Sequence, residues 1–112
     1  MQVPASYEAL AQIIDSGSKC VLFFTADWCP DCQFIAPLMP TIEQDHPNLN
    51  FVEVNRDSFL DLAKKWDIYG IPSFVVIADG RELGRLVNKK RKTKAEVSAF
   101  LAQFNEEMKE EK

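Results

Sequence analysis

A short, nearly continuous apolar run, CVLFFTA at residues 20–26, most constrains how this chain can fold. Such a run is typical of a β-strand buried on both faces, because a strand with one exposed face alternates apolar and polar residues. A second strand is predicted at residues 49–55, and a helical segment separates the two. A strand, a crossover helix and another strand require a parallel pair. The sequence therefore predicts a central sheet with helices on both faces.

The helical segment after the first strand begins at Pro30, a residue that suits the first helical position because it has no N–H to leave unpaired. Pro37 and Pro40 each remove a helix hydrogen bond, so this helix is expected to be kinked or split. Ser6 is a candidate N-cap for an earlier helix. Apolar residues at helical spacing predict further helices at residues 7–14, 58–66 and 97–104.

The last two predicted strands, at residues 73–78 and 81–87, flank the dipeptide Asp79-Gly80. Asp-Gly between apolar runs is a strong signal for a type I′ hairpin, so these strands are expected to be antiparallel. A short extra strand is predicted at QVP, residues 2–4. The expected fold class is α/β, with a mixed central sheet of four to five strands flanked by helices on both faces.

The chain length of 112 residues fits a single domain, expected at residues 1–106, with residues 107–112 as a charged extension of the last helix. A net charge of −4 argues against nonspecific nucleic-acid binding, which needs a basic surface. No apolar run approaches the roughly 20 residues that span a bilayer. The N-terminus lacks the pattern of a signal peptide, so we expect a cytoplasmic protein without membrane attachment, and a monomer.

Two of the three cysteines, Cys29 and Cys32, are separated by two residues and could hold a metal, form a structural disulfide or pass electrons. A zinc site needs further ligands at suitable spacing, and only Cys20 and His46 remain, so no metal is expected. Three cysteines are too few for a disulfide framework. Cys20, inside the first strand, is expected to be an inert core thiol.

Cys29 falls where the buried strand has ended and the helix begins at Pro30. At this N-cap position the unpaired N–H groups and the helix dipole favour an anion, and a thiolate is the anion that thiol–disulfide exchange requires. Cys32, three residues on, is expected to be buried by the first turn. Cys29 is therefore the predicted attacking thiol and Cys32 the resolving thiol. Trp28 can shield this corner and offer a flat apolar surface to a partner, although ordinary packing would also explain it.

Taken in order, ADWCPDC, IAPLM, VNRD, YGIPSF, the DG turn and the final amphipathic helix make the chain resemble the thioredoxin family. The resemblance implies the thioredoxin fold and a redox-active Cys29–Cys32 disulfide, with no bound cofactor. It also implies a cis peptide at Ile71-Pro72, packed beside the cysteines, although a trans turn proline remains the alternative. There the Ile71 backbone could pair with an extended substrate.

The implied activity is reduction of protein disulfides, with a separate reductase that regenerates the dithiol. Substrates are expected to contact Trp28, Gly70, Ile71, Pro72 and Asn88, where Asn88 stands in place of the glycine that the family usually carries. An isomerase or oxidase of the same fold is one alternative. A module that binds a partner through Trp28 and Ile71, with incidental redox activity, is another.

The chain departs from the family inside the sheet. Thioredoxins commonly have a buried aspartate in the strand before the motif and a lysine facing it, and Phe23 and Glu53 occupy these positions here. A carboxyl group in an apolar pocket can exchange a proton near neutral pH, so Glu53 is a candidate proton relay for Cys32. The alternative is that Glu53 points to solvent.

Trp28, Pro30, Asp31 and Pro72 are expected to modulate the site. Asp31 places a negative charge near Cys29 and should disfavour its thiolate, which argues for a reductant, since strong oxidants of this fold stabilise the reduced form. A plain acidic residue in the first helical turn is the alternative. The basic run Lys89, Lys90, Arg91 and Lys92 is either a solvated loop or a surface that steers an acidic partner.

Overall fold

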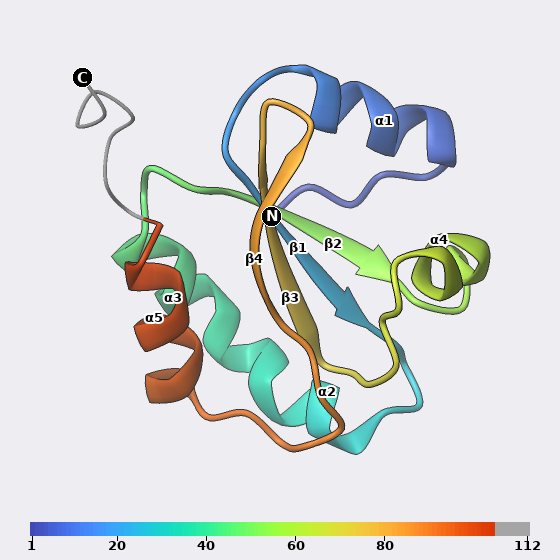
Figure 1. Ribbon diagram of the computed structural model, residues 1–112. Coiled ribbons are helices and arrows are strands. Elements are labelled where there is room, and N and C mark those ends of the chain that lie inside the picture. Colours follow the sequence, from blue (N-terminus) through green and yellow to red (C-terminus); the bar gives the residue numbers. More distant parts are fainter. Residues whose placement is uncertain (105–112) are drawn as a thin grey trace.

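In the computed structural model, residues 1–104 are described, and they form a mixed four-stranded sheet of order β2-β1-β3-β4 (Figure 1). The strands are β1 (Cys20–Thr25), β2 (Asn50–Asn55), β3 (Ser73–Ala78) and β4 (Arg81–Leu86). β1 pairs parallel with β2 and antiparallel with β3, and β3 pairs antiparallel with β4. The predicted parallel pair and the mixed sheet are both confirmed.

Helices cover both faces of the sheet, and Figure 1 shows α1 and α4 on one side with α2, α3 and α5 on the other. The helical elements are α1 (Tyr7–Asp15), α2 (Pro30–Ile35), the 3₁₀ turn η1 (Ala36–Leu38), α3 (Met39–Asp45), α4 (Leu60–Lys65) and α5 (Lys94–Ala102). Side chains alternate along β1, so Leu22 and Phe24 enter one half of the core and Val21 and Phe23 the other. All four are buried, as expected of a strand with two covered faces.

Local sequence signals determine where α1 begins, where the helix after β1 is interrupted and where the chain turns between β3 and β4. Ser6 caps α1 by accepting a hydrogen bond from the Ala9 N–H. The helix after β1 is interrupted by η1, which contains Pro37, before α3 resumes the helical path. Asp79 and Gly80 have φ of 53° and 75°, the left-handed values that both central residues of a type I′ turn require. The predicted split helix and hairpin are therefore confirmed.

Two expectations are corrected by the structure. The helix predicted at residues 58–66 is shorter, because the Asn55 side chain accepts hydrogen bonds from the Asp57 and Ser58 N–H groups and holds a turn there. The extra strand predicted at residues 2–4 is reduced to a single parallel bridge between Gln2 and Val52. The domain boundary expected at 106 and the charged extension at 107–112 lie outside the described residues.

Candidate active site

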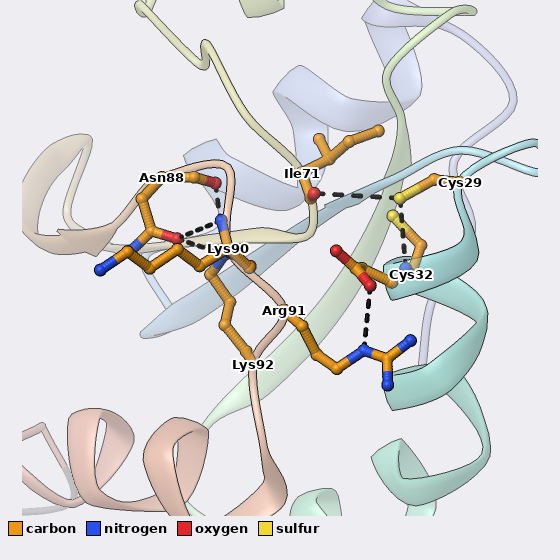
Figure 2. Close-up of polar contacts among 8 residues, drawn as sticks. Cys29, Cys32, Ile71, Asn88, Lys90, Arg91 and Lys92 are labelled. Atoms are coloured by element: carbon orange, nitrogen blue, oxygen red, sulfur yellow. Dashed lines mark hydrogen bonds and ion pairs between the residues drawn. The ribbon is translucent and has the colours of Figure 1, made fainter.

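Cys29 is the N-cap of α2, with Pro30 at the first helical position, as predicted. Its Sγ accepts a hydrogen bond from the Cys32 N–H at 3.2 Å and lies 3.8 Å from the Ile71 carbonyl oxygen, to which the thiol donates (Figure 2). The free N–H groups at the start of a helix carry partial positive charge, so they stabilise a thiolate on this sulfur. Cys29 is thus placed where a nucleophilic thiol is favoured.

Cys32 lies one turn along α2 and is 1% exposed, compared with 4% for Cys29. Both thiols are free, so the structure describes the dithiol form. The pKa of Cys32 is raised from 9.0 to about 11, mainly by burial and also by a hydrogen bond with Cys29, while hydrogen bonds with Thr25 and Ala26 oppose the shift. Cys32 is therefore a protonated thiol at neutral pH.

The peptide bond between Ile71 and Pro72 is cis, and the carbonyl oxygen of Ile71 lies beside the Cys29 sulfur. Pro72 is buried, whereas Ile71 is half-buried and packs against the cluster of Ala26, Cys29 and Cys32. Among the described residues, the Ile71 N–H has no backbone acceptor. An open backbone amide beside the reactive sulfur is the arrangement that an extended substrate strand needs.

A shallow groove of about 330 Å³ opens over Cys29. Its lining residues are Trp28, Cys29, Pro30, Asp31, Arg56, Tyr69, Gly70, Ile71 and Lys89. Trp28 and Tyr69 are exposed by 58% and 63%, so the groove has two aromatic walls. Cys32 is absent from this lining, so an incoming disulfide meets Cys29 first.

Ion pairs frame the groove on two sides. The Asp31 carboxylate pairs with Arg91 Nε at 2.9 Å, and the Arg91 guanidinium lies 4.4 Å from the centre of the Phe34 ring. Arg56 pairs with Asp57 at 3.3 Å, and Asp57 also accepts a hydrogen bond from Trp28 Nε1 at 2.7 Å. Trp28 is therefore held at the rim by its indole N–H rather than packed into the core.

Lys92 corrects the expectation that the whole basic run faces outward, because its side chain is fully buried. Its ammonium donates to the Asn88 side-chain oxygen at 2.8 Å, to the Asn88 carbonyl at 3.3 Å and to the Lys90 carbonyl at 2.7 Å (Figure 2). Burial lowers the pKa of Lys92, although nearby negative charges, Glu96 first and then Asp31, oppose that shift. Asn88 therefore lies behind the groove lining as the acceptor for this lysine.

A second hollow, of about 320 Å³, lies on the α2 face of the sheet and is lined by Cys32, Glu53 and Phe23 among others. Glu53 pairs in register with Phe23 across β1 and β2 and is half-buried. Phe23 is buried and stacks on Phe74, with 5.1 Å between ring centroids. The thiol of Cys32 and the carboxylate of Glu53 thus line the same hollow, on one side of the sheet.

The structure therefore brings together most of the residues predicted from sequence. Trp28, Gly70 and Ile71 line the groove with Cys29, whereas Pro72 is buried, Asn88 is half-buried, and neither lines it. Tyr69 was not predicted, and the exposed aromatic residue directly before Gly70 was the signal that could have indicated it. The Arg91 contact with Asp31 was also missed, since the two residues are 60 positions apart.

No group of three or more His, Cys, Asp or Glu side chains within residues 1–104 is arranged to hold a metal ion. In the same part of the chain, no helix has the length and apolar character needed to cross a bilayer. A helix-capping thiol, a buried second thiol and an adjacent open backbone together define a thiol–disulfide oxidoreductase.

Comparison with known proteins also indicates a thiol–disulfide oxidoreductase. A family model for thioredoxin matches residues 3–103. The mitochondrial thioredoxin-2 of Schizosaccharomyces pombe is 33% identical over 93 residues, which cover 83% of this chain and 68% of that protein. Thioredoxin H-type 1 of Nicotiana tabacum is 35% identical over 78 residues, covering 70% of this chain and 62% of that protein.

Among solved structures, the Fasciola hepatica thioredoxin superposes with a TM-score of 0.79 at 28% identity, over 92% of this chain and 98% of that chain. The chain belongs to the thioredoxin family. Its class of activity is that of a protein-disulfide reductase.

Proposed function

We propose that this protein reduces protein disulfides, with Cys29 as the attacking thiol and Cys32 as the resolving thiol. The observation that carries this assignment is the asymmetry of the pair. Cys29 Sγ accepts the N–H of Cys32 at the start of α2 and lines the groove, whereas burial raises the pKa of Cys32 to about 11. A thiolate is the nucleophile in exchange, so the sulfur that lines the groove at the helix N-terminus, rather than the buried protonated thiol, attacks first.

In the first step the Cys29 thiolate attacks one sulfur of the substrate disulfide, forming a mixed disulfide and releasing the other substrate sulfur as a thiolate. In the second step Cys32 loses its proton and attacks Cys29 Sγ, which releases the remaining substrate sulfur and leaves a Cys29–Cys32 disulfide. Two electrons pass from the protein to the substrate. A separate reductase must then return two electrons to the pair.

The Ile71 backbone supports the placement of substrate. Its carbonyl lies 3.8 Å from Cys29 Sγ, and its N–H has no backbone acceptor among residues 1–104. An extended substrate segment could pair with this N–H and bring its disulfide over Cys29, with Trp28 and Gly70 on either side. Pro72 and Asn88 support this wall without lining it.

Glu53 is the proposed proton acceptor for Cys32 in the second step. Both residues line the same hollow, and Glu53 faces the α2 side of the sheet at the position that pairs with Phe23. The hollow is large enough for a water molecule to connect the carboxylate and the thiol. This placement favours the relay over the alternative in which Glu53 points to solvent.

Trapping tests the assignment of the two thiols. Cys32→Ser should stall the reaction as a mixed disulfide on Cys29, and Cys29→Ser should form no adduct at all. Mass spectrometry of each variant after incubation with an oxidised model protein measures this directly. An adduct on Cys32 in the Cys29→Ser variant, formed at a comparable rate, would contradict the assigned order.

The Glu53 relay is tested by Glu53→Gln, which keeps the shape and removes the ionisable group. We expect the rate of mixed-disulfide resolution to fall near neutral pH and to recover as pH rises, because Cys32 then ionises without help. Formation of the mixed disulfide should not change. A pH–rate profile of resolution that matches the unmodified protein would rule the relay out.

We further propose that the protein acts as a cytoplasmic monomer in cellular electron transport to disulfide substrates, within a single domain at residues 1–106. The free and buried Cys20 supports a reducing compartment, where unpaired cysteines persist. A reduction potential near or above about −180 mV would instead indicate the isomerase or oxidase alternative.

A further inference from the structure

The loop between β4 and α5 is organised around the buried ammonium of Lys92. An ammonium has three N–H donors, and Lys92 Nζ has three oxygen acceptors, all contributed by Asn88 and Lys90. The Asn88 side-chain oxygen also accepts a hydrogen bond from the Lys90 N–H at 2.9 Å. A buried charge is tolerated only when its hydrogen bonds are satisfied, so this arrangement fixes the loop in one conformation.

The same loop is packed directly against the substrate groove. A Cβ on Gly70 would lie 2.3 Å from the Asn88 carbonyl oxygen and 2.8 Å from the Lys89 nitrogen, so the two backbones are in close contact. The Tyr69 hydroxyl donates to the Val87 carbonyl at 3.0 Å on the same side. Lys89 is consequently held at the groove rim, where it lines the opening together with Cys29.

The charges around the groove do not cancel. Asp31 is paired with Arg91, and Asp57 is paired with Arg56. Among the described residues, Lys89 and Lys90 have no acidic partner, and both side chains are exposed. The groove therefore carries a surplus of positive charge at its rim, although the whole chain has a net charge of −4.

We propose that the groove selects disulfides flanked by acidic residues, with Lys89 contacting a carboxylate of the substrate and Lys92 positioning the loop that presents it. This inference rests on the proposed disulfide reductase function and specifies its substrate class. A carboxylate near Lys89 meets an unpaired ammonium whose backbone is already held in place, so only the exposed lysine side chain has to be ordered on binding. The preference should be sensitive to salt, because an exposed ion pair is screened.

The test uses three synthetic peptide disulfides that differ only in whether glutamate, glutamine or lysine flanks the half-cystine. Their kcat/KM for reduction is measured with dithiothreitol as the regenerating reductant. The glutamate peptide should be reduced about threefold faster than the glutamine peptide at low salt for each carboxylate that meets Lys89 or Lys90, as expected of an exposed ion pair. The lysine peptide should be the slowest, and the differences should shrink at high salt.

Lys89→Glu should reverse the order of the glutamate and lysine peptides. Arg81→Glu changes the net charge of the chain equally but lies beside the hairpin at the opposite end of β4 and β3, so it should keep the order of the unmodified protein. Reversal in both variants would mean that overall charge, rather than Lys89, sets the preference, and would overturn the proposal.

The positioning role of Lys92 is tested by Lys92→Met, which keeps a long buried side chain and removes the ammonium. The ratio of kcat/KM for the glutamate and glutamine peptides should fall towards one. Partial unfolding would lower both rates equally and leave this ratio unchanged, so the readout separates positioning from stability. An unchanged ratio would remove Lys92 from the proposal.

Different outcomes would contradict the charge preference and the reductase function. If the unmodified protein reduces all three peptides at the same rate, the proposed function stands and the charge preference is wrong. If it reduces none of them while dithiothreitol alone accounts for the turnover, the reductase function itself is wrong.

Discussion

Replacing Cys32 with alanine isolates the contribution of its buried thiol to stability, together with the coupling of this thiol to Cys29 and Lys92. Burial raises the pKa of this thiol from 9.0 to about 11. Between these two values the unfolded chain has lost the Cys32 proton and the folded chain retains it. The stability of the reduced protein is therefore complete below about pH 9 and falls as pH rises towards 11, because the thiolate is better accommodated in the unfolded state.

The size of the effect follows from the shift. A shift of about two pKa units corresponds to roughly 3 kcal/mol, of which roughly 2 kcal/mol should be lost by pH 11. Other groups titrate in this range, and Lys92, whose lowered pKa has the opposite sign, stabilises the fold as pH rises. Groups that do not interact with Cys32 contribute equally to the unmodified protein and to Cys32→Ala, so their contributions cancel in the difference, whereas Cys29 and Lys92 retain a part that depends on Cys32.

Urea unfolding of both proteins under strong reductant, at pH 8 and at pH 11, measures this difference. The stability of the unmodified protein should fall by about 2 kcal/mol relative to Cys32→Ala across the interval. Residue-resolved alkylation, followed by mass spectrometry, should show Cys32 becoming reactive only at the upper end. A constant stability difference, together with alkylation of Cys32 that has its midpoint near pH 9, would refute the reasoning from burial.

Three further substitutions test contacts around the groove. Gly70→Ala should destabilise the protein by about 1–3 kcal/mol in urea unfolding, since its Cβ would meet the Asn88 carbonyl oxygen at 2.3 Å and the backbone cannot yield easily. Unchanged stability would show that the two loops can separate. Asp31→Asn should raise the rate of Cys29 alkylation at neutral pH, whereas Arg91→Gln, which leaves the Asp31 carboxylate unpaired, should lower it, each by roughly twofold. Changes in the same direction would exclude a charge effect of the pair on Cys29.

The parts of the fold that could be predicted from sequence are those set by neighbouring residues. Cys29 caps α2 because Pro30 fixes the first helical turn, and Asp79-Gly80 forms the hairpin because both residues tolerate positive φ. The two ends of α4 are set by a side-chain hydrogen bond and a positive φ angle, which the spacing of apolar residues does not reveal. Asn55 holds a turn before the helix, and Asp67, with φ of 58°, follows its C-cap, so periodicity alone overestimated its length.

The parts that could not be predicted depend on contacts between distant segments. A run of four basic residues is usually solvated, and nothing local indicates that Lys92 turns inward while Lys89 and Lys90 remain exposed. Arg91 reaches Asp31 only because the fold brings the β4–α5 loop beside α2. The pairing of Asp31 with Arg91 could therefore be recognised only from the tertiary structure.

All of the hydrogen-bond acceptors of Lys92 lie within the same short loop, at Asn88 and Lys90. The hydrogen bonds of the buried ammonium are thus encoded within residues 88–92, while Arg91 connects the loop to Asp31 and Phe34 and Gly70 leaves room for its backbone. A segment of this kind could be exchanged between proteins of the same fold that carry these facing residues. Partner choice could then change through the side chain at position 89 while the cysteine chemistry is left untouched.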